Sequence, residues 1–503
     1  MLASENGAKV LVVNPLVGID EGVLPMGLSM LISALKSEGH ILELFDTTRF
    51  DLETGHYVRA MNEKYLNFLP VKDGHVYKEK IRYSDSEVIE LFNSKVNSFR
   101  PDVIAVSITC SHSYGLVRKL LNGLHYKGAL CVMGGKHVTY DHENVIHEPF
   151  VDAVCIGDGE KALLEFCKAV ANGGDYRTIG NLWVKCDGKV IKNSLVSFLD
   201  LDDLPFPDWT LYDDDLFYKP MRGKTYRYGY IETSRGCPFR CPYCHNDKEQ
   251  DLFKGLGSPV RLKSVDRIIR EARHQKEKYK LEMVKFLDED FLAKPSEYLE
   301  EFSEKYRDLN LPFLVCVRPE RMTRKNARLL KDMGCIQTSI GVESGNDYIR
   351  KEIYKRKINR EVIVDGFKVF REEGIYTTAL NMIGAPYETK EQIFDTIHLN
   401  RELLSNDCLV SVFQPFKGTV LRDLCVKEGF ASEDEDCEGT TLEGSVLNMP
   451  QLSKDDIWGF RRTFTLYSRV PKIFFLLVGI CRRYDNRLSE VIFSLLARFF
   501  GKR

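Results

Sequence analysis

The chain has 503 residues, more than a single hydrophobic core usually serves, so two or three domains are expected. Hydrophobic residues make up 44% and charged residues 29%, a balance that excludes a disordered, collagen-like or small disulfide-stapled protein. The 71 basic and 73 acidic residues leave a net charge of −2, so the protein has no overall basic field with which to bind nucleic acid.

The cysteines and the first residues both indicate a cytoplasmic protein. The 14 cysteines show no even framework of close spacings, and no charged and apolar signal stretch precedes Lys9. The longest apolar run, Ile473 to Cys481, has nine residues, whereas a membrane span needs about 20. We therefore expect reduced thiols and no transmembrane helix.

Residues 1–195 alternate strand and helix patterns. Buried-type apolar runs predict strands over 9–14, 40–46, 102–107, 129–135 and 152–157. Apolar spacings of three and four predict helices over 27–38, 116–124 and 160–170. Residues 50–100 form an insertion with one expected helix over 85–97. The alternation predicts a doubly wound, Rossmann-like α/β domain with a parallel sheet.

A second alternating series follows an acidic, proline-rich linker over residues 196–225. Strands are expected over 226–233, 283–288, 313–318, 335–342, 376–383 and 409–415. Helices are expected over 264–279, 296–308, 324–333, 359–373 and 388–405. Six strand–helix repeats predict an open (β/α)6 partial barrel over 226–420, with its chemistry at the carboxyl ends of the strands.

Three cysteines follow the first barrel strand within eight residues. Cys237, Cys241 and Cys244 have the spacing C-x3-C-x2-C, and three thiolates so close in sequence can converge on a soft metal or an iron–sulfur centre. A structural zinc site is the alternative, with His245 as a fourth ligand. Because His245 is adjacent to Cys244, the two are poorly placed for one tetrahedral site. Three ligands would instead leave one iron of a four-iron cluster open.

The C-terminal region, residues 421–503, is expected to be mainly helical and to end in a basic tail. Residues 469–503 carry eight Lys and Arg against Asp485 and Glu490, a net charge of +6. One broad apolar helix face is expected, made of Val491, Ile492, Leu495, Leu496, Phe499 and Phe500. This face either packs on the barrel or lies on an anionic membrane surface, which would imply a lipid-like substrate.

The cysteine loop resembles that of the radical S-adenosylmethionine (SAM) enzymes. Further motifs of that class follow in order: Phe286 to Phe291, Gly341 to Gly345, Ile383 to Glu388, and Phe413 to Thr419. The resemblance implies a [4Fe-4S] cluster on Cys237, Cys241 and Cys244, with S-adenosyl-L-methionine bound at its open iron. It also implies SAM-binding roles for a set of residues after the strands: Tyr243 near the adenine, Glu343 at the ribose, and Ser344, Gly384 and Pro386.

Residues 9–170 resemble the cobalamin-binding domain of the cobalamin-dependent radical SAM family. The matching pieces include 9–15, 25–28, 101–107, 132–137 and 157–160. The resemblance implies cobalamin contacts at Ser107, Thr109, Gly134 and Gly135. The loop after the first strand lacks the histidine that ligates cobalt in other cobalamin domains, and His112 follows the third strand after Cys110. A lone histidine more often serves a local hydrogen bond, so we expect no protein imidazole on cobalt.

The resemblance implies a methyltransferase that acts on an unactivated carbon or phosphorus centre of a small or lipid-like molecule. An oxidative cyclase or ring-rearranging enzyme would show the same motifs, and a non-catalytic cobalamin- or metal-binding accessory protein is a third hypothesis. A flavodoxin- or ferredoxin-type electron donor is expected as a partner. Arg318 ends the third barrel strand, where it would either orient an anionic substrate or cofactor carboxylate or form an ordinary ion pair.

Overall fold

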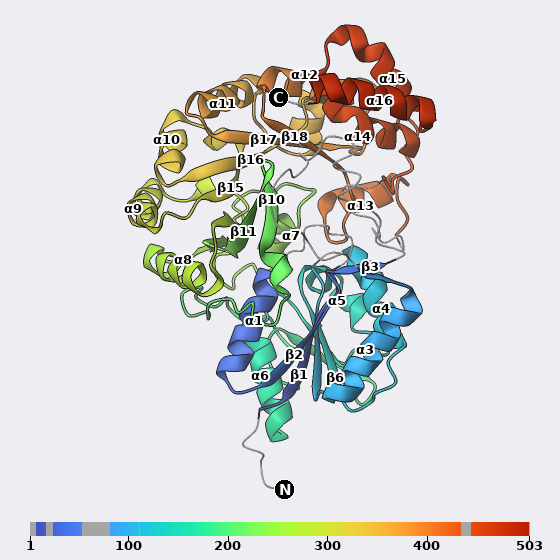
Figure 1. Cartoon of the computed structure of the whole chain (residues 1–503). Coiled ribbons are helices and arrows are strands. Elements are labelled where there is room, and N and C mark those ends of the chain that lie inside the picture. The colour runs from blue at the N-terminus through green and yellow to red at the C-terminus, as the bar shows by residue number, and fades with distance from the viewer. Residues whose placement is uncertain (1–6, 17–23, 53–80, 110, 434–443, 502–503) are drawn as a thin grey trace. The chain divides into compact units, whose positions relative to one another are not determined.

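The computed structural model describes residues 7–16, 24–52, 81–109, 111–433 and 444–501. The chain divides into two compact units (Figure 1). The described part of the first unit runs to Phe217 and includes Asp251–Pro259. The second contains Tyr218–Gln250 and the described residues from Val260 onward.

The first unit is built on a seven-stranded sheet with the order β2-β1-β5-β6-β7-β8-β9. Its parallel strands are β1 (Lys9–Asn14), β2 (Ile41–Asp46), β5 (Val103–Ser107), β6 (Leu130–Gly134) and β7 (Ala153–Cys155). The strand order reverses between β1 and β5, and in doubly wound sheets ligands bind outside the carboxyl ends of the strands at such a point.

Helices cover both faces of this sheet (Figure 1). They are α1 (Met26–Ser37), α3 (Asp85–Phe99), α4 (Tyr114–Asn122), α5 (Lys136–Val145) and α6 (Glu160–Asn172). Because the sheet is covered on both faces, β1 is buried throughout its apolar stretch, from Val10 to Val13. The doubly wound fold and the predicted elements are confirmed; residues 53–80 of the predicted insertion lie outside the described residues.

The sheet also contains a hairpin that the sequence-based prediction missed. β8 (Leu182–Cys186) and β9 (Lys189–Lys192) are antiparallel and extend the parallel sheet at β7. Asp187 and Gly188 form the turn, both with positive φ (50° and 73°), which matches the Asp-Gly hairpin signal. α5 was missed as well, because its sequence is polar and its backbone leaves helical geometry at Asp141.

The second unit contains the predicted open barrel. Its parallel strands, in spatial order, are β11 (Lys224–Ile231), β14 (Met283–Phe286), β15 (Phe313–Val317), β16 (Cys335–Glu343), β17 (Tyr376–Ile383) and β18 (Asp407–Val412). β10 (Tyr218–Met221) pairs antiparallel with β11 at the edge. The connecting helices are α8 (Val265–Tyr279), α9 (Ser296–Tyr306), α10 (Arg324–Asp332), α11 (Arg360–Glu372) and α12 (Lys390–Leu403). All six strands and five helices were predicted, with shifts of a few residues at their ends.

The barrel strands alternate between two environments. Along β17 and β18, fully buried residues alternate with half-buried ones. On β14, the buried Phe286 contacts Phe302 of α9. The buried residues of the strands therefore face the helices. The half-buried set therefore faces the interior of the barrel.

Three C-terminal helices complete the second unit: α14 (Lys454–Arg469), α15 (Phe475–Arg483) and α16 (Arg487–Phe500). They lie together in the red part of Figure 1. Phe460 and Phe464 of α14 are fully buried in a core that includes Val478 of α15 and Phe493 of α16. Among the described residues, no helix has the length and apolar character that a membrane span requires.

The remaining elements are short. They are β3 (Phe50–Leu52) with β4 (Ile81–Tyr83), β12 (Ser234–Arg235) with β13 (Arg261–Leu262), and the helices α7 (His245–Leu252) and α13 (Val420–Lys427). α7 and α13 matter for the site, since they hold the cysteine loop on either side.

Candidate active site

The cysteine loop lies at the carboxyl end of the first barrel strand, between β12 and α7. The side chain of Gln250 donates hydrogen bonds to the carbonyl groups of Cys237 (2.9 Å) and Phe239 (3.3 Å). On the other side, the backbone N–H of Leu421 donates to the carbonyl of Pro242 at 2.9 Å. The loop that carries the three cysteines is therefore fixed by α7 and α13.

The three thiols are half-buried, which disfavours the charged form. Burial raises the pKa of Cys237 to about 11 and that of Cys244 to about 12. Thiolates at these positions need a nearby positive charge, which a metal centre supplies. The residues present thus fit a metal-bound state of the loop.

The zinc alternative gains no support from this geometry. Nε2 of His245 lies 3.0 Å from the carbonyl oxygen of Lys417, so that nitrogen is engaged with the backbone. Among the described residues, no three His, Cys, Asp or Glu side chains lie close enough to hold one metal ion. A four-iron cluster instead binds each cysteine at a different iron, so the thiolates need not converge on one centre.

Arg318 lies beside the cysteine loop. Its Nη1 donates to Sγ of Cys241 at 3.4 Å, its Nη2 lies 2.7 Å from Oε1 of Glu320, and its guanidinium lies 3.8 Å from the centre of the Phe239 ring. Of the two alternatives from the sequence, the structure shows the ion pair, and Arg318 also places positive charge against Cys241. A contact of Arg318 with an anionic substrate or a cofactor carboxylate stays a prediction.

Glu343 ends β16 in an unusual conformation. Its φ is +61°, and a register shift between β16 and β17 falls between Gly341 and Glu343. Oε1 of Glu343 lies 2.8 Å from Nη1 of Arg356. A Cβ atom on Gly341 would lie 2.6 Å from that same Oε1 and 3.0 Å from Nη1 of Arg356, so a larger residue would require these side chains to shift.

Arg356 is the functional residue that the sequence-based analysis missed. Its side chain is almost fully buried, with the residue 2% exposed. Nε and Nη2 have no hydrogen-bond partner among the described residues. Buried guanidinium groups are normally satisfied, so these two donors fit an anionic ligand such as the carboxylate of SAM. A lone arginine in the segment Lys355-Arg-Lys carries no sequence signal for this role.

Tyr243 belongs to the same cluster of side chains. Its ring lies 5.0 Å from that of Tyr354 in an edge-on arrangement. Burial raises the pKa of the Tyr243 hydroxyl, and the negative charge of Glu343 raises it further, which places the two side chains near each other. Tyr243, Glu343 and the cysteine loop are therefore brought together at one end of the barrel, as the motifs predicted.

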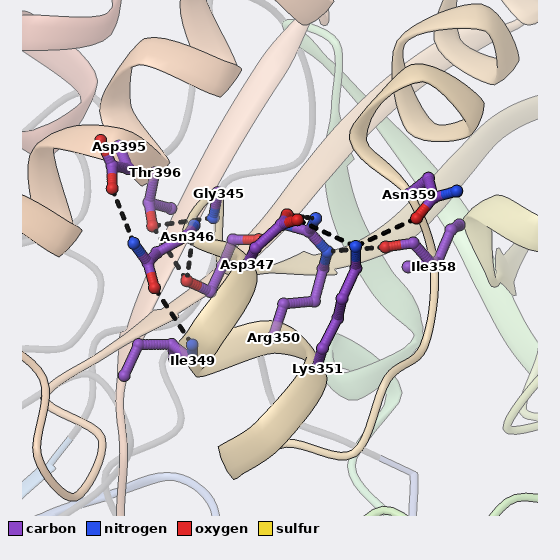
Figure 2. A network of polar contacts seen from close by, with 11 residues as sticks. Gly345, Asn346, Asp347, Ile349, Arg350, Lys351, Ile358, Asn359, Asp395 and Thr396 are labelled. Atoms are coloured by element: carbon purple, nitrogen blue, oxygen red, sulfur yellow. Dashed lines mark hydrogen bonds and ion pairs between the residues drawn. The ribbon is translucent and has the colours of Figure 1, made fainter.

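A polar network fixes the turn that follows Glu343 (Figure 2). Nη1 of Arg350 donates to the carbonyl of Ser344 at 2.9 Å, and its Nε donates to the carbonyl of Ile358 at 3.1 Å. Asp347 pairs with Arg350 and also with Lys351, at 2.8 Å from Lys351. Arg350 thus ties the segment that carries Glu343 to the segment that carries Arg356.

The hydroxyl of Ser344 takes part in this network. It lies 3.3 Å from the hydroxyl of Thr396 and accepts a hydrogen bond from the backbone N–H of Asn346 at 3.2 Å. Asn346 in turn donates to Asp395 at 2.7 Å, as Figure 2 shows. Ser344 is fully buried, so these contacts give its side chain a structural function in the turn. A SAM contact at Ser344 stays a prediction.

The turn after β17 contains the predicted Gly384 and Pro386. Gly384 has φ +81°, and Oε2 of Glu388 accepts hydrogen bonds from the backbone N–H groups of Gly384 (2.5 Å) and Ala385 (3.2 Å). Oε1 of Glu388 and the hydroxyl of Tyr354 are buried without a partner among the described residues. Burial raises the pKa of Glu388 to about 8. Glu388 shapes the backbone of this turn, and Pro386 is buried within it.

Two further carboxyl groups with unsatisfied oxygens follow β14. Oδ1 of Asp288 accepts from the hydroxyl of Thr233 at 2.6 Å and from Nζ of Lys294 at 3.1 Å. Oδ1 of Asp290 accepts from the backbone of Arg318 at 3.4 Å. In both residues Oδ2 is buried and has no partner among the described residues. The motif over 286–291 was identified from the sequence, but it gave no role to either carboxyl group.

In the first unit, the predicted cobalamin residues meet at the carboxyl ends of β5 and β6. The strand register pairs Ser107 with Gly134. Beyond the strands, the N–H of Ile108 donates to the carbonyl of Gly134 at 2.8 Å. Gly135 has φ +98°, and a Cβ atom there would lie 2.5 Å from the carbonyl oxygen of Ile108. This close backbone approach forms a cradle without side chains, which fits an inserted nucleotide tail.

Other predicted features of this edge are located as follows. Thr109 is exposed just beyond β5, and His112 is half-buried in the short 3-10 helix Ser111–Ser113. Cys110 lies outside the described residues. No imidazole was expected on cobalt, and that stays a prediction.

Comparison with known proteins agrees with the division of the chain into two units. The B12 binding domain model matches residues 20–166, and the Radical SAM superfamily model matches residues 231–399. An uncharacterized methyltransferase of Pyrococcus horikoshii is 27% identical over 411 residues, which cover 80% of this chain and 86% of the relative. The cytidylyl-2-hydroxyethylphosphonate methyltransferase of Streptomyces wedmorensis is 24% identical over 489 residues, 88% of this chain and 86% of the relative.

Two solved structures share the fold. The cobalamin-dependent SAM radical enzyme OxsB superimposes with a TM-score of 0.63 at 14% identity, covering 98% of this chain and 71% of OxsB. The radical SAM methyltransferase TsrM from Kitasatospora setae, with cobalamin and a [4Fe-4S] cluster bound, gives 0.60 at 16% identity, covering 85% and 79%. The chain thus contains a B12 binding domain and a radical SAM domain, each matched by its family model, and it shares its fold with these two structures.

Proposed function

We propose that the protein is a cobalamin-dependent radical SAM methyltransferase that acts on an unactivated carbon or phosphorus centre. The observation that carries this proposal is the buried Glu343–Arg356 pair beside the cysteine loop, in a chain that also has a cobalamin-binding domain. The two relatives that cover most of the chain are both named methyltransferases.

The cofactors of this family are a [4Fe-4S] cluster, SAM and cobalamin. When bound, the cluster and SAM supply one-electron radical chemistry, and cobalamin supplies a transferable methyl group. The residues of this chain position these groups. Cys237, Cys241 and Cys244 hold the cluster, and Arg356 and Glu343 orient SAM by its carboxylate and ribose. The barrel interior excludes water from the reaction.

The inward face of the barrel suggests the chemistry of the substrate. Lys285 follows Val284 on β14 and precedes Phe286, which packs outward against α9, so Lys285 faces the interior. It is half-buried and forms no ion pair with a described residue. Burial raises the pKa of the Cys316 thiol on β15, and the positive charge of Lys285 opposes that rise. We infer that Lys285 binds an anionic group of a small-molecule substrate.

The substrate inference can be tested with a matched pair of variants. Lys285→Met should leave cluster content and basal SAM cleavage unchanged, but cleavage should no longer accelerate when anionic candidate substrates are added. Lys285→Arg should retain part of this response, because it keeps the positive charge. If Lys285→Met responds to anionic candidates as the wild type does, Lys285 has no role in substrate binding. Cytidylyl-2-hydroxyethylphosphonate is the first candidate, since one relative is named for that substrate.

Ring formation is the second candidate function. Anaerobic magnesium-protoporphyrin IX monomethyl ester cyclases of Rubrivivax gelatinosus and Cereibacter sphaeroides are 23% and 22% identical to this chain. They match 61% and 66% of this chain, less than the two methyltransferases do. The mass of the product separates the two functions, because methylation adds one methyl group, whereas oxidative cyclisation removes hydrogens.

The deciding experiment uses the whole protein, reconstituted anaerobically with iron and sulfide. It should hold a four-iron cluster, retain hydroxocobalamin after desalting with a base-off spectrum, and form 5′-deoxyadenosine when reduced with dithionite. Replacement of all three loop cysteines by alanine should abolish the cluster and the cleavage. Stoichiometric zinc without iron would refute the cluster, and an absence of 5′-deoxyadenosine would favour a non-catalytic binding protein.

The remaining partners follow from this chemistry. The cluster needs a one-electron donor, and we propose a flavodoxin- or ferredoxin-type protein in the cytoplasm. The domain limits that we propose are 1–195 for cobalamin binding, 196–225 for the linker, 226–420 for the radical SAM core and 421–503 for the C-terminal region.

A further inference from the structure

Exposed apolar side chains are concentrated on the last two helices. Of the 19 large hydrophobic residues that are exposed among the described residues, nine lie between Ile473 and Phe499. Leu476 is 85% exposed, Ile473 82% and Phe499 74%. Soluble proteins seldom expose so many large apolar groups together unless the surface binds something.

These side chains form one stripe on each helix. The first stripe contains Ile473, Leu476, Leu477, Ile480 and Tyr484, and the second contains Leu488, Val491, Leu495 and Phe499. Within α15 and α16 the spacing places the members on one helix face, while Ile473 lies in the preceding 3-10 helix Lys472–Phe474 and Tyr484 directly follows α15. Both helices already bury another face: Val478 and Cys481 of α15 and Phe493 and Leu496 of α16 are in the core with α14. The stripes are therefore additional to the apolar surface that folding requires.

The exposed and buried faces of α16 can be compared with the apolar face that the sequence predicted. One broad apolar face was predicted for residues 491–500, with packing on the barrel and membrane contact as alternatives. The structure divides the predicted set: Leu496 is buried, Ile492 and Phe500 are partly buried, and Val491, Leu495 and Phe499 are exposed. The helix thus packs on the unit with one side and leaves an apolar side in solvent.

Unpaired cations flank the stripes. Lys472, Arg483, Arg487 and Arg498 are exposed and form no ion pair with a described residue. Arg487 lies four residues before Val491 and Arg498 seven after it, so both lie along the edge of the α16 stripe. By the same spacing, Arg483 lies seven residues after Leu476 and borders the α15 stripe.

Two arginines of the three C-terminal helices are neutralised by contrast. Arg482 of α15 lies 3.2 Å from Asp456, and Arg462 of α14 lies 3.0 Å from Asp485. The other acidic group of this stretch, Glu490 of α16, is exposed. The outer surface keeps a positive charge and an apolar character together.

We propose that the outer face of α15 and α16 docks on an anionic lipid surface. The apolar stripes would enter the boundary between headgroups and acyl chains, while the four cations contact the anionic headgroups. A second copy of the chain is a poorer occupant, because a two-fold contact would bring the same cations together. The inference is independent of the proposed methyl transfer.

Vesicle co-sedimentation of the full-length protein tests the proposal. The protein should bind vesicles of phosphatidylcholine with one quarter phosphatidylglycerol, and binding should weaken at least tenfold at high salt or on pure phosphatidylcholine. Leu476→Asp/Phe499→Asp should abolish binding, and Arg483→Glu/Arg487→Glu/Arg498→Glu should reduce it at least tenfold. All five positions are exposed, so thermal melting and cluster content should stay at wild-type values.

Matched control variants exclude a general effect of charge or hydrophobicity. Val362→Asp changes an exposed valine of α11, and Arg270→Glu/Arg273→Glu/Lys278→Glu changes three exposed cations of α8. Neither should alter vesicle binding. The proposal is overturned if the tail variants bind as the wild type does, or if the wild type does not bind at all. It is also overturned if Leu476→Asp/Phe499→Asp converts a dimer to a monomer in sedimentation velocity without any effect of lipid, since the face would then join two copies.

Discussion

Oε1 of Glu343 lies 2.8 Å from Nη1 of Arg356, and the two residues reach this contact from separate segments, the end of β16 and the loop before α11. Arg356 is nearly fully buried; its Nε and Nη2 make no hydrogen bond to a described residue, although Nη2 lies 4.0 Å from Oε2 of Glu320. The pair therefore combines a carboxylate that can accept from hydroxyl groups with a guanidinium that can bind a carboxylate.

The first prediction concerns this pair. Arg356→Lys should weaken SAM binding by about tenfold or more, because an ammonium group cannot contact Glu343 and a ligand carboxylate through a planar fork. Glu343→Gln should weaken binding by about tenfold through loss of charge-assisted hydrogen bonds. Titration calorimetry of the reconstituted protein with SAM measures both effects. Wild-type affinity in both variants would show that SAM binds elsewhere.

The site was predicted in part because its motifs are local. The cysteine spacing and the residues Tyr243, Glu343 and Gly384 could be identified because each lies in a short turn directly after a strand, and parallel strands bring such turns to one end of a barrel. Arg356 could not be identified. Its role depends on tertiary contacts of a loop 13 residues beyond Glu343, where no periodicity or turn signal exists.

The fold was predictable for a similar reason. Strands buried on both faces and amphipathic helices leave strong periodic signals, so the eleven predicted strands and nine predicted helices of the two units all occur in the predicted order. The β8–β9 hairpin was missed although Asp187-Gly188 marks it, because its strands mix charged and apolar residues. The exposure of Leu495 and Phe499 was likewise hidden, since a helix pattern does not reveal which part of an apolar face finds a partner.

The second prediction concerns Arg350, which joins the carbonyl groups of Ser344 and Ile358. Arg350→Met would leave both carbonyls without this donor and Asp347 with Lys351 alone, so unfolding should become easier by about 2–4 kcal/mol. Arg350→Lys should keep more of this stability and still raise the KM for SAM several-fold, because the two segments are no longer held in register. A positioning role predicts this change in KM with little change in kcat. If Arg350→Met and Arg350→Lys lose the same stability and neither changes the KM for SAM, Arg350 has a purely structural role.

The third prediction uses the pH dependence of stability. Burial raises the pKa of Glu388 to about 8, well above the value of a carboxyl group in the unfolded chain. The folded state therefore favours the protonated form, and its advantage is complete below about pH 4.5 and is lost as the pH rises to about 8. Over that window the wild type should lose roughly 3–5 kcal/mol that Glu388→Gln does not lose. Urea unfolding at a series of pH values measures the difference.

The glutamine variant is a close test because its amide oxygen can still accept from the N–H groups of Gly384 and Ala385. Glu361→Gln, the same substitution at an exposed position of α11, controls for the substitution itself. Parallel pH profiles for the wild type and Glu388→Gln would contradict a raised pKa at this position.

The last prediction concerns the cradle in the first unit. Gly135→Ala places a Cβ atom 2.5 Å from the carbonyl oxygen of Ile108, so the loops after β5 and β6 must separate. Retention of hydroxocobalamin after desalting should fall about tenfold or more, while cluster content and the basal cleavage of SAM should be unchanged because they depend on the second unit. Gly173→Ala is the matched control, since Gly173 also has a positive φ (+63°) but nothing lies within 4 Å of its Cβ position. Alanine costs about 1 kcal/mol in the left-handed helical region of Gly173 (ψ 27°) and more at Gly135, whose ψ of 178° lies in a region almost restricted to glycine, so thermal melting of both variants is measured alongside. Equal retention of cobalamin in the two variants would show that the close approach at Gly135 does not form the binding site.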